Sequence, residues 1–131
     1  MAKSFLQMAE EAMAQAHAVG AAEAMKELDE NKSALLVDVR DAEEVRETGL
    51  GLRAINAPGR SIAWKACQEF DKAYREPELQ DRSRRILATC GSSPCYRGAS
   101  AANLLREMGF TNVSYVDDGM KALLAKGLPT E

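Results

Sequence analysis

The sequence predicts an α/β fold with a mainly parallel sheet. Short apolar runs at residues 34–39 and 86–89 have the length and composition of strands that are buried on both faces, and residues 113–116 are predicted to form another strand. Segments with apolar residues at helical spacing separate these three predicted strands along the chain. Because strands that alternate with helices in this way usually form a parallel sheet, we expect one layer of strands covered by helices.

Two helices are predicted before the first of these strands. Residues 4–18 carry apolar side chains at helical spacing, Gly20 interrupts the pattern, and a second short helix follows. His17, the single histidine, lies far in sequence from every cysteine and is interpreted as a surface or helix-end residue. A histidine-dependent nucleophile or metal site is therefore not expected.

A short helix should follow the first predicted strand. Asp41 and Glu44 have the spacing of a capping box, which places its start near residue 42. We interpret Glu43, Glu44 and Glu47 as a solvated face whose charge favours the first turn, and not as an acid/base pair. Asp38, inside the strand, needs a partner at the strand's end, because an unpaired buried charge is costly.

The middle of the chain is predicted to hold one longer helix between two loops. Residues 48–59 form a loop with a short strand near residues 54–56. Ser61 is a candidate cap for a helix running to about residue 75, with Cys67, Phe70 and Tyr74 on its buried face. Cys67 is interpreted as a buried structural thiol and Trp64 as a core residue. Residues 76–85 read as a polar loop, and its arginines as a solvated patch: Arg82, Arg84 and Arg85.

The C-terminal third repeats the strand–helix order. The strand at residues 86–89 is followed by a helix whose apolar stripe ends before Gly109, a C-cap glycine. A strand at residues 113–116, a turn at residues 117–119 and a last helix at residues 120–126 complete the chain.

Composition limits the classes of function. A chain of 131 residues is one domain, and a net charge of -3 with a pI near 5.3 makes nucleic acid an unexpected partner. No apolar run is long enough for a membrane helix, and no export signal is recognisable. Three cysteines without zinc-ligand spacing indicate free thiols in a reducing cytoplasm, without a metal or other cofactor.

The candidate site is the loop between the strand at residues 86–89 and the helix after it. Cys90 ends the strand, and ligands bind at the carboxyl ends of strands in parallel α/β sheets. The helix directs free N–H groups and its positive dipole end at the loop, an environment that lowers a thiol pKa to roughly 3.5–7.5. Arg97 adds a planar cation suited to an oxyanion. We therefore expect a thiolate that attacks an anionic sulfur donor, or a phosphate, without a histidine base.

Five motifs in order resemble the rhodanese-like domain family. LLVDVRDAEEV resembles the family's first strand and helix, and AINAP its A-x-N-I-P motif. ILATC and RGASAANLLREMGFTNV resemble the active-site strand and helix, and VDDGMKALLAKGLP resembles the closing segment. The resemblance covers about residues 34–129. It implies a five-stranded parallel sheet with helices on both faces, and a single domain over residues 1–131 with its core at about 21–129 and an added N-terminal helical segment at 1–20.

The resemblance also implies sulfur transfer by double displacement. Cys90 would take a sulfane sulfur from a small anionic donor such as thiosulfate, and pass it from a persulfide to cyanide, a thiol or a protein acceptor. Arg97 and the rest of the loop would bind the donor's oxyanion. The loop residues concerned are Gly91, Ser92, Ser93, Cys95, Tyr96 and Gly98.

Departures from the family pattern fall in this loop and leave alternatives open. The family's usual C-x-x-G-x-R is here C-x6-R, wider also than the C-x5-R of the phosphatases that share the fold. Gly98 replaces the usual Ser or Thr, Asp118 a glycine and Leu123 the usual tryptophan. A non-catalytic binding module and a phosphatase or arsenate reductase-like enzyme are therefore alternatives. Cys95 either resolves an oxidised Cys90 as a disulfide, or fills space.

Overall fold

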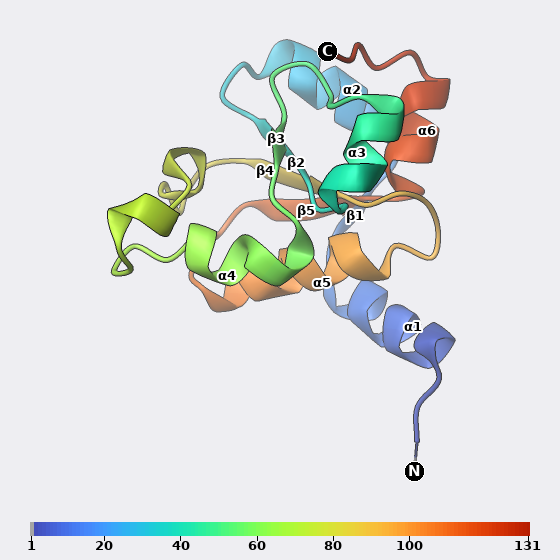
Figure 1. Ribbon diagram of the computed structural model, residues 1–131. Coiled ribbons are helices and arrows are strands. Elements are labelled where there is room, and N and C mark those ends of the chain that lie inside the picture. Colours follow the sequence, from blue (N-terminus) through green and yellow to red (C-terminus); the bar gives the residue numbers. More distant parts are fainter. Residues whose placement is uncertain (1) are drawn as a thin grey trace.

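The computed structural model describes residues 2–131, and its centre is a five-stranded parallel sheet (Figure 1). The strands are β1 (Ala18–Val19), β2 (Leu35–Asp38), β3 (Ile55–Asn56), β4 (Ile86–Thr89) and β5 (Val113–Val116). They lie in the order β1-β5-β4-β2-β3, and every neighbouring pair is parallel. The predicted α/β fold is confirmed. β1, which adds an edge to the sheet, lies in a segment that the sequence pattern had assigned to a helical extension.

Helices cover both faces of the sheet because strand residues alternate between two apolar clusters. Leu35 and Ile86 face one cluster, to which α1 (Phe5–Gln15), α4 (Ile62–Lys65) and α5 (Tyr96–Glu107) contribute. Leu36 and Leu87 face the other, formed with α2 (Ala21–Glu30) and α6 (Gly119–Ala125). α3 (Ala42–Thr48) begins with the predicted capping box of Asp41 and Glu44. Figure 1 shows α4 and α5 on the side of the sheet opposite α2.

The predicted helix over residues 61–75 is wrong. α4 ends at Lys65, and two short 3-10 turns follow, Lys72–Tyr74 and Pro77–Leu79. Local hydrogen bonds stabilise this segment instead. The Asp71 carboxylate caps the 3-10 turn at Lys72–Tyr74, and the N–H of Glu76 donates to the carbonyl oxygen of Lys65 at 2.8 Å.

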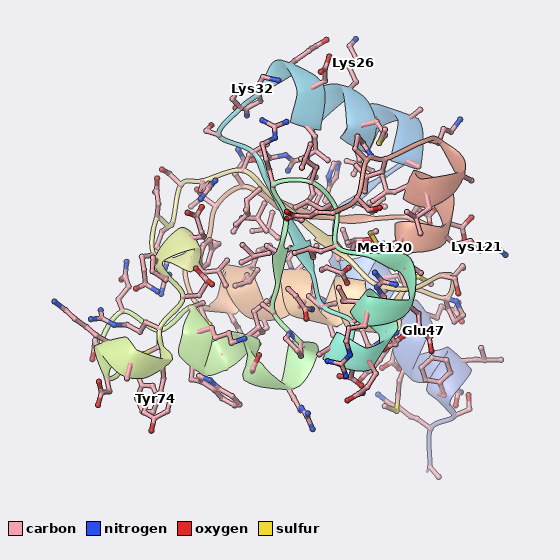
Figure 2. The ribbon with its side chains drawn as sticks, turned by 45° about the horizontal axis from the view of Figure 1, so that its top comes forward. Lys26, Lys32, Glu47, Tyr74, Met120 and Lys121 are labelled. Carbon is pink, nitrogen blue, oxygen red and sulfur yellow. The ribbon has the colours of Figure 1, made fainter. Side chains whose placement is uncertain are left out.

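The side chains assigned to that helix's buried face are mostly outside the core. Phe70 and Tyr74 are 47% and 57% exposed and contact each other, with ring centroids 5.5 Å apart; Tyr74 points away from the protein body in Figure 2. Trp64 is exposed as well, which corrects its assignment to the core, and Cys67 is only half-buried. The Ser61 hydroxyl donates to the carbonyl oxygen of Pro58 and caps no helix.

The three arginines of residues 76–85 connect elements of the fold, so their interpretation as a solvated patch is wrong. Arg82 donates to the carbonyl oxygen of Ala66 at 2.7 Å. Arg84 pairs with Glu78 at 2.6 Å. Arg85 pairs with Glu27 on α2 at 3.1 Å and donates to the Ser114 hydroxyl of β5.

The region after α1 agrees with the interpretation of His17 as a helix-end residue. His17 lies exposed between α1 and β1, with its Nδ1 2.8 Å from the Ser114 hydroxyl oxygen. Throughout residues 2–131, each helix is too short or too polar to cross a membrane.

Candidate functional site

The loop from Cys90 to Cys95 starts at the carboxyl end of β4, where α6 holds its first residues in place. The carbonyl oxygens of Cys90 and Gly91 accept the N–H groups of Met120 and Lys121, at 2.7 and 2.9 Å. Gly119 makes this approach possible. Its φ is +54°, and a Cβ atom there would lie 2.4 Å from the Cys90 carbonyl oxygen, so a side chain at this position requires the backbone to move.

The Cys90 sulfur lies under the first turn of α5, as the sequence predicted. Its side chain is nearly buried, at 2% exposure, but lines a hollow at the surface. A hydrogen bond from the Cys95 thiol is the main cause that lowers the pKa of Cys90 to about 7. Burial opposes this change, while the N–H of Gly98 and the charge of Arg97 reinforce it. A large fraction of Cys90 is therefore thiolate at neutral pH.

Cys95 is fully buried beneath the loop, next to Cys90. Its sulfur and that of Cys90 both lie 3.7 Å from the carbonyl oxygen of Ser92, and the Cys95 sulfur is also 3.6 Å from the carbonyl oxygen of Val116. The Cys90 thiolate and burial raise the pKa of Cys95 far above its ordinary value. Cys95 therefore stays protonated and acts as a hydrogen-bond donor. Both cysteines are free thiols.

Arg97 does not stand free in the site but pairs with a carboxylate of α3. Its Nη1 and Nη2 donate to the two Glu44 carboxylate oxygens at 2.6 and 3.0 Å. This bidentate bond is the main cause that lowers the pKa of Glu44 to about 2. The interpretation of Glu44 as part of a solvated face is therefore wrong. The capping box was the available signal, because it fixes Glu44 beside the Asp41 N–H, at 3.1 Å.

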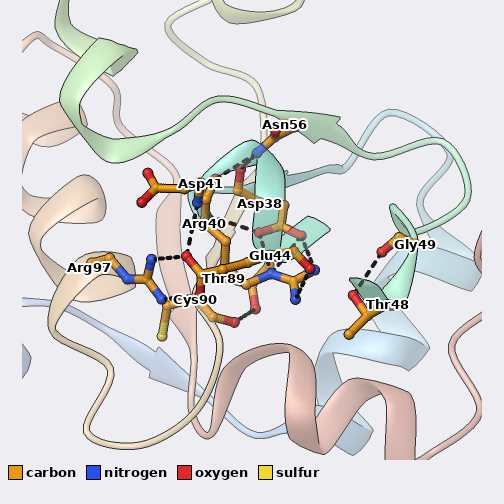
Figure 3. A network of polar contacts seen from close by, with 10 residues as sticks. All are labelled: Asp38, Arg40, Asp41, Glu44, Thr48, Gly49, Asn56, Thr89, Cys90 and Arg97. Carbon is orange, nitrogen blue, oxygen red and sulfur yellow. Dashed lines mark hydrogen bonds and ion pairs between the residues drawn. The ribbon is translucent and has the colours of Figure 1, made fainter. Parts of the chain in front are cut away.

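A second ion pair lies behind the first and fixes the segment that leads from β2 to α3 (Figure 3). Arg40 donates to both carboxylate oxygens of Asp38, at 3.0 Å from Nε and 2.8 Å from Nη2. This is the partner that the sequence required for Asp38. The Asn56 amide donates to the carbonyl oxygens of Asp38 and Arg40, each at 2.9 Å. Together these bonds hold the start of α3, and so Glu44, against the cysteine loop.

The hollow above Cys90 has a volume of about 510 Å³. Six of the eight predicted site residues line it: Cys90, Gly91, Ser92, Ser93, Tyr96 and Arg97. Cys95 and Gly98 are buried below, and a Cβ atom on Gly98 would lie 3.6 Å from the Cys90 sulfur. Glu44, Pro94 and Phe5 complete the lining. No sequence signal pointed to Phe5, which is 85 positions from Cys90 along the chain.

Backbone N–H groups of the loop are available to an anion. In the part of the chain that the structure describes, no protein oxygen accepts the N–H groups of Gly91, Ser92 or Ser93. Such donors beside a helix N-terminus favour an anionic ligand. Within residues 2–131, no three His, Cys, Asp or Glu side chains come together as metal ligands.

This fold and this loop define a class of small α/β domains built around one cysteine at the end of a strand. The chain belongs to the rhodanese-like domain family, whose model matches residues 21–126. A comparison with curated protein sequences gave no match.

Solved structures with the same fold include proteins with different descriptions. A protein of unknown function from Rhodopseudomonas palustris, described as a possible tyrosine phosphatase, is 21% identical with a TM-score of 0.87, over 100% of this chain and 96% of that one. The human single-domain sulfurtransferase TSTD1 is 25% identical with a TM-score of 0.70, over 85% and 97%. The Alr3790 protein from Anabaena is 25% identical with a TM-score of 0.68, over 86% and 90%.

Proposed function

We propose that this protein transfers sulfane sulfur through a persulfide on Cys90. The observation that carries the proposal is the environment of the Cys90 sulfur. It accepts hydrogen bonds from the Cys95 thiol and the Gly98 N–H, which lower its pKa to about 7, and it lines an open hollow. A thiolate formed in this way needs no histidine base. Membership of the rhodanese-like family and the likeness to a human sulfurtransferase support the same reaction.

The first half-reaction breaks the sulfur–sulfur bond of the donor. With thiosulfate, the Cys90 thiolate attacks the outer sulfur, a Cys90 persulfide anion forms, and sulfite leaves with the electron pair of the broken bond. The N–H groups of Gly91, Ser92 and Ser93 lie at the same hollow and are suited to the sulfonate oxygens. Arg97 supplies a positive charge there, partly offset by Glu44.

The second half-reaction returns Cys90 to the thiolate. A nucleophilic acceptor attacks the outer sulfur of the persulfide, and Cys90 leaves; cyanide gives thiocyanate, and a thiol gives a new persulfide. We expect the physiological acceptor to be a small thiol or a protein cysteine. A reducing cytoplasm suits this chemistry, because it keeps Cys90 and Cys95 reduced between turnovers.

Mass spectrometry after thiosulfate treatment tests the proposal. We expect the intact protein to gain the mass of one sulfur atom on Cys90, and cyanide then to release one equivalent of thiocyanate. Cys90→Ser should do neither, while Cys67→Ser, a thiol outside the hollow, is the matched control. An unmodified wild-type protein, or thiocyanate from Cys90→Ser, contradicts the proposal.

A phosphatase is the second candidate, and two observations favour it. The interval between Cys90 and Arg97 is wider than in sulfurtransferases of this family, and the R. palustris protein with the same fold is described as a possible tyrosine phosphatase. Hydrolysis of p-nitrophenyl phosphate that is lost in Cys90→Ser would favour this function over sulfur transfer.

A non-catalytic binding module is the third candidate. It is favoured by the low exposure of Cys90 and by the pairing of Arg97 with Glu44, both of which restrict access to the site. Slow alkylation of Cys90 by iodoacetamide at pH 7, no faster than that of an ordinary exposed thiol, would support it.

A further inference from the structure

The N-terminal helix, which lies outside the family match, reaches the hollow above Cys90. α1 (outside the family match over residues 21–126) runs alongside α5 (Figure 1). Phe5, the first residue of α1, lines the hollow together with Tyr96, the first residue of α5. The Phe5 and Tyr96 rings meet edge to face, with centroids 5.7 Å apart and an interplanar angle of 71°. Two aromatic rings from different elements therefore stand beside the reactive sulfur.

Phe5 is held in this position by both ends of α1. A capping box between Ser4 and Gln7 fixes the first turn. Near its other end, α1 is fastened to α5, because Asn103 donates to the carbonyl oxygen of Ala12 at 3.0 Å and Arg106 to that of Gln15 at 2.6 Å. Phe5 is nevertheless 55% exposed, so part of its ring remains free to contact a ligand.

Apolar surface continues past Tyr96 and Arg97 on the other side. A second hollow, of about 370 Å³, shares these two residues, and its wall combines apolar side chains (Val39, Ala101 and Leu104) with polar ones (Asp41, Arg60 and Ser100). The charges around this second hollow balance, which suits an uncharged ligand body. Arg97 already pairs with Glu44, and Asp41 and Arg60 carry opposite charges at the hollow's wall.

We propose that Phe5 and Tyr96 form a subsite for the acceptor, and that it selects thiols whose carbon body is apolar. This inference rests on the proposed sulfur transfer. In the second half-reaction the acceptor thiol gives its proton to the Cys90 persulfide anion, and the resulting thiolate attacks the outer sulfur of the protonated persulfide. A bond forms between the two sulfurs, the bond to Cys90 breaks, and the products are the acceptor persulfide and the Cys90 thiolate. The acceptor's apolar body lies against the Phe5 and Tyr96 rings while this happens.

Steady-state kinetics with thiosulfate and three thiol acceptors test the subsite. We expect wild-type protein to have a lower KM for benzyl mercaptan than for 2-mercaptoethanol or glutathione. Phe5→Ala should raise the KM for benzyl mercaptan roughly fivefold to tenfold more than that for 2-mercaptoethanol, because one ring contact is lost. Phe5→Leu should give an intermediate value. Leu6→Ala, an exposed apolar residue of the same turn outside the hollow, is the matched control.

Protection of Cys90 against iodoacetamide tests the subsite without sulfur transfer. Benzyl alcohol, which carries the same ring but no thiol, should slow alkylation in wild type and in Leu6→Ala, and protect less in Phe5→Ala. Equal KM changes for both thiols, or protection that is equal in Phe5→Ala and wild type, overturn the subsite. Protection without any persulfide formation overturns the proposed function and leaves an apolar binding site.

Discussion

The site has a floor and a mouth, and each contains an ion pair between an arginine and a carboxylate. The floor consists of Asp38, Arg40, Cys95 and Gly119, and its ion pair is buried, with side-chain exposures of 0% for Asp38 and 4% for Arg40. The mouth consists of Phe5, Glu44, Tyr96 and Arg97, and its ion pair is 39% and 40% exposed.

The same chemistry therefore has different consequences in the two regions. When a buried ion pair loses one partner, the other remains as an uncompensated buried charge. The Asp38–Arg40 pair of the floor therefore mainly stabilises the fold. A half-exposed pair can exchange its partner for water or a ligand at low cost, so the mouth is free to respond to substrate. Substitutions in the floor should lower stability or change the thiolate, whereas those in the mouth should change substrate use.

The largest expected effect is that of Asp38→Asn, which breaks the floor's ion pair. The substitution leaves the Arg40 charge buried and unpaired, and we expect a loss of about 3–5 kcal/mol in the free energy of unfolding. Urea denaturation measures it. Glu43→Gln is the matched control, because Glu43 pairs with Arg46 at 4.0 Å on the surface and should change stability by less than about 1 kcal/mol. Similar losses in both variants would remove the distinction between buried and exposed pairs.

Gly119→Ala tests the close approach of α6 to the base of the loop. A left-handed backbone costs a non-glycine residue about 1–2 kcal/mol, and the contact of the new Cβ with the Cys90 carbonyl oxygen adds roughly 1–3 kcal/mol. Gly127→Ala has a similar positive φ but open space around it, so it should show the first cost alone. The difference between the two unfolding free energies measures the steric contact. Equal values would mean that the loop moves freely away from α6.

The floor was largely predictable from sequence because burial leaves local patterns. β2, β4 and β5 are buried on both faces, and β2 and β4 belong to short, mainly apolar runs; a cysteine that follows such a run lies at the carboxyl end of the sheet. β1 was missed because a strand of two residues leaves no periodic pattern. The helix expected over residues 61–75 stops early because, after α4, the aromatic residues Phe70 and Tyr74 at helical spacing have no core to pack against.

The mouth was only half predictable because it is built from contacts distant in sequence. Tyr96 and Arg97 begin α5, directly after the loop that the strand and helix define, so they were found. Glu44 is 53 positions from Arg97 along the chain. The capping box shows locally that Glu44 turns back to the Asp41 N–H, but not that its carboxylate also meets the arginine. Phe5 belongs to a helix whose place is decided by packing on α5, which no pattern within α1 reveals.

Cys95→Ala tests whether the floor tunes the thiolate. Removing the main hydrogen-bond donor should raise the pKa of Cys90 from about 7 toward the ordinary thiol value. In a plot of the iodoacetamide alkylation rate against pH, the midpoint should then move to higher pH than in wild type. At pH 7 the rate should be lower than in wild type, by roughly tenfold for each unit by which the pKa of Cys90 rises. Cys95→Ser, whose hydroxyl still donates, should restore most of the rate. An unchanged midpoint in Cys95→Ala would show that α5 and Arg97 lower the pKa of Cys90 without the Cys95 hydrogen bond.

The same variant addresses the other role predicted for Cys95, that of a resolving thiol. If hydrogen peroxide oxidises Cys90 to a sulfenic acid, attack by the Cys95 sulfur would form a disulfide and release water. Wild-type protein would then lose two hydrogen atoms in mass, whereas Cys95→Ala would keep an added oxygen. The buried, protonated state of Cys95 favours its role as a donor over this one.

The smallest expected effect is that of Glu44→Gln, which breaks the ion pair of the mouth. The pair is half-exposed, so unfolding should become easier by less than about 1 kcal/mol. Activity should change in the opposite sense, because removing the carboxylate charge leaves the Arg97 charge available to an anionic donor. We expect the KM for thiosulfate to fall by roughly threefold at low ionic strength, and less in high salt. Since the pKa of Glu44 is about 2, the effect should be constant between pH 5 and 9, where Glu44 is ionised throughout. A rise in the KM for thiosulfate would mean instead that Glu44 positions Arg97 for the donor. The ion pair of the mouth would then have a structural role, as the ion pair of the floor has.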